Sequence, residues 1–148
     1  MVSFQTTLRI SAAGMSAQRH RLNVIASNLA NLQTTRTPEG GPYQRKDVIF
    51  QTKPLVVDSQ NESLMESGQQ KSLSVEMVKV ITDSRPPIMK YQPEHPDADP
   101  QGYVAYPNVN AIEEMVNMLS ATRSYEANLT MMKTTKDMVN KTIEILKV

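Results

Sequence analysis

The side chains that could do chemistry are few and widely spaced. The chain has two histidines, His20 and His95, and no cysteine. A histidine can act as a general base or bind a metal, but each role needs further polar groups held near it. His20 is flanked by Arg19 and Arg21, a pattern typical of a solvated helix face, and His95 stands alone in a proline-rich stretch. Neither histidine is expected to be catalytic, and the missing cysteines exclude disulfides and thiolate metal sites.

Two pairs of acidic residues resemble the paired carboxylates used in general acid and base catalysis. Asp97 and Asp99 lie among prolines, where aspartate commonly shapes turns. Glu113 and Glu114 are neighbours on a predicted helix, so their side chains point to different faces. Glu113 fits the carboxylate of a capping box that begins at Asn110, and we expect capping to explain both glutamates.

A pair of glycines, Gly40 and Gly41, is the remaining candidate, because glycine-rich loops can bind phosphate. No Lys-Ser/Thr dipeptide follows the pair, so the phosphate-loop pattern is absent. We expect these glycines to supply backbone positions with positive φ in a tight turn. The sequence therefore predicts no catalytic residue, no cofactor and no metal ligand, and the chain is not expected to be an enzyme.

The composition indicates one domain that does not bind nucleic acid. The chain has 148 residues, close to the usual length of a single domain, with 16 basic and 15 acidic residues. A net charge of +1 argues against nucleic acid, whose binding needs a large positive excess. No stretch approaches the roughly 18 apolar residues that span a bilayer, and no cleavable signal peptide is visible. Direct membrane insertion is therefore not expected.

Proline and glycine divide the chain into three parts. All nine prolines and four of the five glycines lie between Gln33 and Asn110. Because proline breaks helices, we predict a mainly α protein with a small β or irregular middle. Residues 1–32 and 110–148 are expected to form long helices that pair as a coiled-coil-like unit, one discontinuous helical domain. The first helix should run from about residue 4 to residue 31, and Asn110 should cap the second. Residues 33–109 form a strand-rich central segment with loops.

Apolar residues recur every seven positions in both predicted helices, which is the spacing of coiled-coil contacts. One series in the first helix starts at Leu8, and a partly polar companion series starts at Ser11. Two such series also run through the second helix. We define the predicted seam as the residues of these series expected to pack within the helix pair and between subunits. They are Leu8, Met15, Leu22, Ile25, Leu29, Leu32, Met115, Met118, Tyr125, Leu129, Met132, Val139 and Ile143.

The central segment gives weaker signals. Residues 43–50 and 73–81 are predicted strands. In the second of these, simple alternation places Leu73, Val75, Met77 and Ile81 on one side and Val78 and Val80 on the other. The polar residues 58–63 predict a loop, and residues 92–100 predict a turn-rich connector.

Several apolar residues of the helices lie outside the predicted seam. They are Ile10, Val24, Ile112, Val116, Leu119 and Met131. Either they pack on the strand region or they are buried between subunits, and the 10 methionines suit a surface that packs against varied neighbours. A head-to-tail contact that does not close on itself builds a helical filament. In that case we expect the terminal helices to fray in the free subunit and to become ordered on assembly.

Two motifs in the first helix, SAAGMSAQ at residues 11–18 and NVIASNLAN at residues 23–31, resemble the flagellar basal-body rod and hook proteins. In that family the Asn-Leu-Ala-Asn signature ends an N-terminal helix. Three further motifs resemble the proximal rod members: TTRTPEGGPYQRKD at 34–47, PDADPQGYVAYPNVN at 96–110 and RSYEAN at 123–128. The resemblance covers both chain ends and is weak across residues 52–71. It defines an elbow between helix and central segment, formed by Asn28, Asn31, Thr34, Gly40, Gly41, Pro42 and Tyr43.

The resemblance implies a structural subunit of the rod that crosses the periplasm. Such a subunit polymerises through its terminal helices, transmits torque and lines the export channel. Its implied partners are further copies of itself, other rod subunits, the base of the flagellum at the MS ring, and the flagellar type III export apparatus. That route uses no cleaved signal. Phe4 and Leu8 resemble the export pattern of early substrates, although both residues also fit the helix seam.

A second functional class is also compatible with part of the sequence. A helical export chaperone or adaptor could bind the amphipathic end of another axial subunit in a groove. The terminal helices alone would permit this function, whereas the glycine- and proline-rich turn and the strand-like middle fit it poorly.

Overall fold

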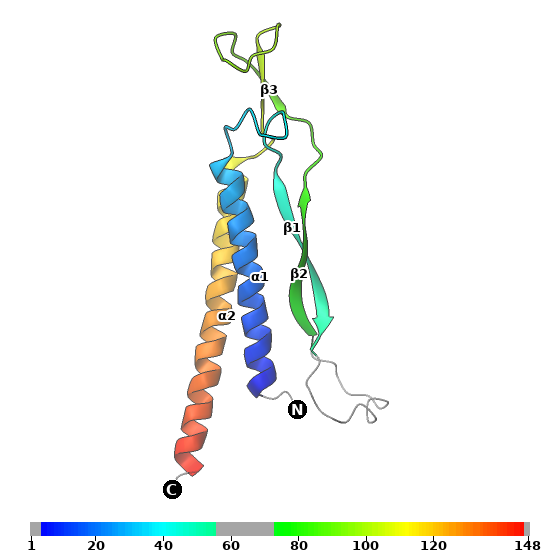
Figure 1. The fold of residues 1–148 in the computed structure, drawn as a ribbon. Helices are drawn as coiled ribbons and strands as arrows, with labels where there is room; N and C mark the ends of the chain where they lie inside the picture. Colours follow the sequence, from blue (N-terminus) through cyan, green and yellow to red (C-terminus); the bar gives the residue numbers. More distant parts are fainter. Residues whose placement is uncertain (1–3, 56–72, 147–148) are drawn as a thin grey trace.

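The computed structural model describes residues 4–55 and 73–146. Its elements, in chain order, are α1 (Phe4–Ala30), β1 (Lys46–Pro54), β2 (Leu73–Thr82), β3 (Ile88–Tyr91), β4 (Tyr103–Tyr106) and α2 (Ala111–Leu146). The two helices lie side by side and antiparallel, so the start of α1 and the end of α2 are at the same end of the molecule (Figure 1). The β1–β2 hairpin packs along α1, and the β3–β4 hairpin extends beyond the opposite end of the helix pair (Figure 1). The predicted fold class is confirmed.

The helix boundaries follow from local chemistry. The amide side chain of Asn31 donates a hydrogen bond to the Ser27 carbonyl (2.9 Å) just beyond the last residue of α1. At the start of α2, Asn110 Oδ1 accepts hydrogen bonds from the backbone N–H groups of Ile112 (3.0 Å) and Glu113 (3.4 Å). Asn110 is therefore the N-cap that the sequence predicts. The 36 residues of α2 extend about 54 Å at 1.5 Å per residue.

The contact between the helices is lined mainly by small and polar side chains. Buried helix residues include Ser11, Ile25 and Asn28 on α1, and Glu114, Ala121 and Thr135 on α2. The helices come close together at Gly14, because a Cβ atom there would lie 2.9 Å from Oδ1 of Asn128. The helix pair thus buries little apolar surface of its own.

Leucine at position 14 is expected to destabilise the helix pair. The added side chain would overlap Asn128, and overpacking of this kind costs about 1–3 kcal/mol. Urea unfolding followed by circular dichroism measures the loss for Gly14→Leu. The matched control is Ala12→Leu, because Ala12 is exposed on the same helix and its substitution should change stability by less than about 0.5 kcal/mol. Equal losses in both variants would contradict the close approach.

The β1–β2 hairpin is antiparallel and contains one irregularity. Met77 pairs with Phe50 and Lys79 pairs with Ile49, so Val78 has no opposite residue. This bulge reverses the alternation along β2. The predicted sidedness of the strand is therefore wrong: Val80 shares the side of Leu73, Val75 and Met77, and Ile81 faces the other way. The strands also end later than predicted, at Pro54 and Thr82. The predicted loop at residues 58–63 lies outside the described residues.

The β3–β4 hairpin was not predicted from the sequence. The rings of Tyr91 and Tyr103 pack edge to face across it, with centroids 5.4 Å apart. Lys90 Nζ lies 4.7 Å from the centroid of the Tyr106 ring on the neighbouring strand. Both strands have four residues, too few for a clear alternating pattern. The residues between them form turns, as predicted for 92–100.

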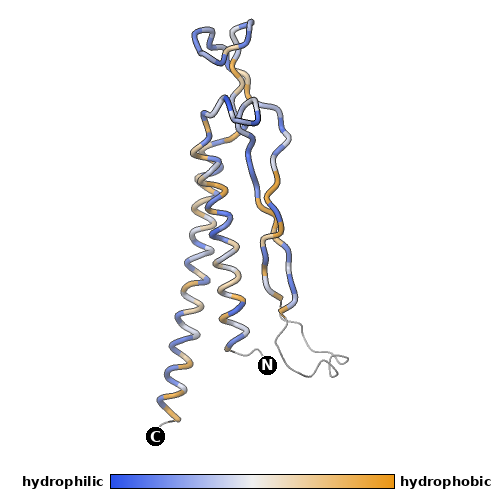
Figure 2. The backbone as a smooth tube through the Cα atoms, in the orientation of Figure 1, coloured by the Kyte–Doolittle hydropathy of each residue, from blue (hydrophilic) through white to orange (hydrophobic). Residues whose placement is uncertain are grey.

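The large apolar side chains of α2 largely remain exposed. Ile112 is 74% exposed, Val116 62%, Leu119 53% and Met131 54%. Within the described residues, no Cα atom of α2 lies within 8 Å of a Cα atom in any strand. The alternative that these four residues pack on the strand region is therefore wrong. Apolar positions continue to the C-terminal end of α2 (Figure 2).

Candidate functional site

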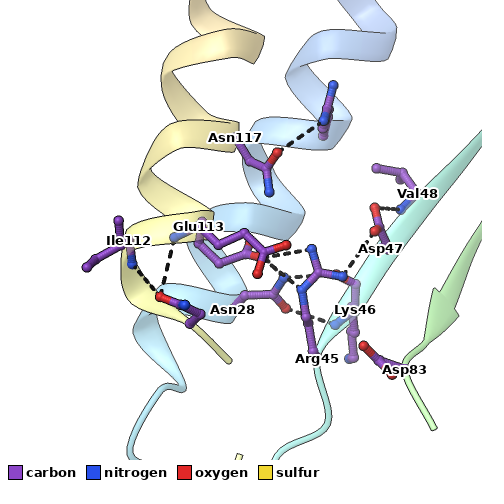
Figure 3. A network of polar contacts seen from close by, with 12 residues as sticks. Asn28, Arg45, Lys46, Asp47, Val48, Asp83, Ile112, Glu113 and Asn117 are labelled. Carbon is purple, nitrogen blue, oxygen red and sulfur yellow. Dashed lines mark hydrogen bonds and ion pairs between the residues drawn. The ribbon is translucent and has the colours of Figure 1, made fainter. Parts of the chain in front are cut away.

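A buried polar network joins three elements at one end of the helix pair (Figure 3). It consists of Asn28 near the end of α1, Tyr43, Arg45, Lys46 and Asp47 at the entry to β1, and Glu114 in the first turn of α2. We call this network the polar junction. It fixes the positions of α1, α2 and the β1–β2 hairpin relative to one another.

Asn28 is fully buried and uses its whole hydrogen-bonding capacity. Its Nδ2 group donates to the Lys46 carbonyl (2.8 Å) and to Glu114 Oε2 (3.1 Å). Its Oδ1 atom accepts from the Lys46 N–H (2.9 Å) and from the Tyr43 hydroxyl (3.0 Å). The amide side chain therefore pairs with the first residue of β1 as another strand would, and it binds α2 as well.

Glu114 is a fully buried carboxylate paired with Arg45. Arg45 Nε donates to Glu114 Oε1 at 2.8 Å, and a second guanidinium nitrogen lies 2.8 Å from the same oxygen. Arg45 also pairs with Asp47 Oδ2 at 3.0 Å. Burial opposes the charge on Arg45, but the hydrogen bonds and charges of Asp47 and Glu114 outweigh it and raise the pKa of the guanidinium. The buried carboxylate is thus compensated by a permanent cation.

Sequence reasoning assigned Glu114 the wrong role. Glu113 is exposed and its backbone N–H is capped by Asn110, whereas Glu114 is the central carboxylate of the polar junction. Its partners Arg45 and Asn28 are 69 and 86 residues away along the chain. No local spacing connects residues so far apart, so the pattern of the sequence carried no signal for the pair.

The structure brings most of the elbow residues together. Tyr43 N–H donates to the Thr34 carbonyl (3.0 Å), and the Thr34 hydroxyl donates to Asn31 Oδ1 (3.2 Å). Gly40 and Gly41 have φ values of +91° and +77°, which confirms the expected positive φ. Pro42 is half-buried between this turn and the polar junction. The function assigned to the elbow stays a prediction.

The predicted seam lies mostly along the edges of the helix contact. Ile25 is its one buried residue, whereas Met115 is 60% exposed and Ile143 46% exposed. The remaining seam residues are half-buried: Leu8, Met15, Leu22, Leu29, Leu32, Met118, Tyr125, Leu129, Met132 and Val139. Phe4, the other residue of the export pattern, is 45% exposed at the start of α1. Burial of these side chains between subunits stays a prediction.

The histidines and aspartates first considered as catalytic residues lie on the surface or form hydrogen bonds within a turn. His20 is exposed on α1. His95 Nδ1 accepts a hydrogen bond from the Asp97 N–H (3.1 Å), and Asp99 Oδ1 accepts from two backbone N–H groups of the same turn. Within residues 4–55 and 73–146 no three acidic or histidine side chains are placed to hold a metal ion. Neither helix in that part of the chain combines the length and hydropathy needed to cross a bilayer.

An exposed ion pair beside the polar junction gives a pH prediction. Hydrogen bonds from Arg85 lower the pKa of Asp83 below its ordinary value of 3.8. A lowered pKa means that the pair stabilises the fold above the pKa of the unfolded chain, and that this contribution is lost as the pH falls through the lowered value. An NMR titration should show Arg85→Gln raising the Asp83 pKa toward 3.8. An unchanged titration would contradict the assignment.

The fold and the polar junction together define a class of protein, an elongated structural subunit. Its terminal helices are held together at one end by the polar junction and carry exposed apolar side chains. Comparison with known proteins agrees with this class. A family model for flagella basal body rod proteins matches residues 8–36, and a model for the C-terminal part of the flagellar basal body rod FlgEFG proteins matches residues 101–145. Each match covers most of one terminal helix and the segment next to it, and the second match also includes β4.

Individual relatives extend the match over nearly the whole chain. The flagellar basal-body rod protein FlgC of Bacillus subtilis is 42% identical, with 99% of this chain and 100% of the relative covered. FlgC of Borreliella burgdorferi is 38% identical, with 96% and 97% covered. FlgC of Salmonella typhimurium is 40% identical, with 92% of each chain covered. The chain belongs to the flagellar basal-body rod protein family, and these relatives place it with FlgC.

Proposed function

We propose that the chain is a structural subunit of the proximal rod of the bacterial flagellum and assembles through its two terminal helices. The observation that carries the proposal is the exposure of large apolar side chains on α2, such as Ile112 (74%) and Val116 (62%), on a helix that packs against none of the described strands. Apolar surface of this extent marks an interaction site. FlgC relatives of nearly the same length support a rod subunit as the protein that presents it.

The polar junction is the kind of rigid connection that a subunit transmitting torque would need. Glu114, Arg45 and Asn28 connect both helices to the β1–β2 hairpin through a buried, fully paired network. A force applied to the β1–β2 hairpin would therefore reach the helices without a flexible joint between them. In this proposal α1 and α2 form the inner helical domain that lines the export channel, and the central segment faces outward and contacts neighbours.

The proposal includes location and partners. The subunit would reach the periplasmic rod through the flagellar type III export apparatus without a cleaved signal, with Phe4 and Leu8 as export residues. Its neighbours would be further copies, other rod subunits and the base of the flagellum at the MS ring. The role is mechanical, and the chain would not act as an enzyme.

The test is a pair of charge substitutions on the helices. Leu29→Asp should leave synthesis and export intact but abolish swimming, because the carboxylate would sit in a contact between subunits. Val116→Arg should do the same from α2, and Val116 is exposed enough that the free subunit keeps its fold. Asn23→Asp, which places the same charge on an exposed polar position of α1, should swim normally.

Isolated basal bodies give the second readout. The wild-type chain should remain in detergent-treated basal bodies, and Leu29→Asp and Val116→Arg should be missing from them. Normal swimming in both variants would overturn the proposal. Recovery of the chain only as a soluble heterodimer with another axial protein would instead identify an export chaperone.

A further inference from the structure

The β3–β4 hairpin has few connections to the other helices and strands. Within residues 4–55 and 73–146, no Cα atom of β3 or β4 lies within 8 Å of a Cα atom in a helix, in β1 or in β2. The turn of the hairpin does reach the loop between α1 and β1, where the Thr35 hydroxyl donates a hydrogen bond to Asp97 Oδ2 at 2.7 Å. This bond joins residues 62 positions apart in the sequence, so it ties the turn to the loop that follows α1.

His95 fixes the position of Asp97 within this turn. Its Nδ1 atom accepts a hydrogen bond from the Asp97 backbone N–H at 3.1 Å. The half-buried His95 ring also packs edge to face with the Tyr106 ring of β4, with centroids 6.3 Å apart. Only a neutral imidazole has a ring nitrogen that can accept a hydrogen bond, because both nitrogens carry hydrogen in the charged form. The contact with the Asp97 N–H therefore requires a neutral His95.

Protonation of His95 would turn this attractive contact into a repulsive one. The new N–H at Nδ1 would point at the Asp97 backbone N–H, so two donors would face each other. The charged ring would also attract the Asp97 carboxylate, which Thr35 holds in the neutral state. Histidine is the side chain whose charge ordinarily changes between about pH 5 and 8, so a modest change in acidity is enough to drive this step.

The charges around His95 belong to β3, to the turn itself and to the loop between α1 and β1. Lys90 Nζ of β3 lies 4.7 Å from the centroid of the same Tyr106 ring, so a charged His95 would bring a second cation to that ring. The charged residues of the turn and the loop are Glu94, Asp97, Asp99, Arg36, Glu39 and Arg45. Arg45 is paired within the polar junction, and the carboxylates of the turn are the groups that would attract the charged ring.

We propose that His95 makes the turn between β3 and β4 a proton-sensitive latch, that is, a contact that opens when the ring gains a proton. With a neutral ring, His95 holds Asp97 on Thr35, and the hairpin stays tied to the end of the helix pair. Protonation of the ring releases Asp97 from Thr35. The hairpin then moves about its two chain connections, residues 83–87 and 107–110, so one side-chain charge sets how firmly it is held.

An NMR titration of the purified chain between about pH 8 and pH 5 tests the first step. At the upper end, the nitrogen shifts of the His95 ring should show hydrogen on Nε2 and none on Nδ1. As the pH falls, the Asp97 amide proton should move upfield with the same midpoint as the His95 ring signals, because it loses its acceptor. Hydrogen on Nδ1 at the upper pH, or an Asp97 amide that does not follow the His95 ring, would overturn the proposal.

His95→Asn is the matched control, because an asparagine side-chain oxygen can accept from the same N–H two residues on and gains no charge. In this variant the Asp97 amide signal should stay constant over the same pH range. His20→Gln removes the other histidine, which is exposed on α1, and should leave the Asp97 titration unchanged. An Asp97 amide that still titrates in His95→Asn would assign the effect to another group and refute the latch.

Distances between two spin labels test the movement of the hairpin. Because the chain has no native cysteine, Gln33→Cys and Gln101→Cys place labels at exposed positions of the α1–β1 loop and of the turn. The distribution of label distances should widen as the pH falls from about 8 to 5, and adding Thr35→Val should widen it at both values. Adding His95→Asn should keep it narrow at both. A distribution in the labelled chain that is the same at both pH values would show that the turn is not released.

Discussion

Replacing Glu114 with alanine is expected to lower the free energy of unfolding by about 3–5 kcal/mol. The substitution leaves the guanidinium of Arg45, which is partly buried, without its fully buried partner, and Asn28 Nδ2 loses an acceptor at 3.1 Å. Breaking one side of a buried pair costs more than the pair contributes, because the remaining charge loses part of its compensation and here keeps only Asp47 as an ionic partner. Urea unfolding followed by circular dichroism measures the difference from the wild-type chain.

The neighbouring residue provides the control for this prediction. Glu113 is exposed in the same helical turn, so Glu113→Ala should cost less than about 1 kcal/mol, the range of a helix-dipole contribution. The double variant Arg45→Met/Glu114→Leu removes both charges and should recover part of the loss. Equal losses for Glu113→Ala and Glu114→Ala would show that the buried pair does not hold the two helices and β1 together.

Asn28→Asp is expected to destabilise the protein more than Asn28→Ala. Alanine deletes the four hydrogen bonds of the amide and leaves the backbone N–H and carbonyl of Lys46 without them, a loss of about 2–3 kcal/mol. Aspartate keeps nearly the same shape but replaces the donating Nδ2 by an oxygen. That oxygen would face Glu114 Oε2 and the Lys46 carbonyl, so two attractive contacts become repulsive.

Denaturant unfolding of both variants gives the order of stability, and the backbone amide signal of Lys46 in NMR spectra reports whether β1 stays attached to α1. Asn23→Asp is the matched control, because Asn23 is exposed on the same helix and its substitution should change stability by less than about 0.5 kcal/mol. If Asn28→Asp were as stable as the wild-type chain, the hydrogen bond from Nδ2 to Glu114 would be refuted.

Features that depend on nearby residues could be predicted from the sequence. Helix α1 lies within one proline-free segment, and α2 begins with the N-cap Asn110 just before a second one, so their limits were correct to about one residue. The positive φ at Gly40 and Gly41 followed from residue type alone. The family followed from motifs that lie near the chain ends, where the family models also match.

Features that depend on residues far apart in the sequence could not be predicted in this way. Arg45 and Glu114 meet only because the chain folds back on itself. The residues around either one do not indicate that it pairs with the other. Val78 forms a bulge because of its partner strand, so counting along β2 alone gave the wrong side for Ile81. The short strands Ile88–Tyr91 and Tyr103–Tyr106 flank the predicted connector at residues 92–100 and have four residues each, too few for an alternating pattern to mark them.

The residues of the polar junction lie far apart in the sequence, and this also limits the stage at which the chain can complete its folding. Asn28, Arg45 and Glu114 come from both halves of the chain, so a polypeptide that has emerged only in part lacks one member, whichever terminus comes first. Contacts between such distant residues form slowly, because a large loop must close before they contribute. A chain threaded lengthwise through a narrow conduit would thus stay extended until it is released, and its final shape would form at the destination.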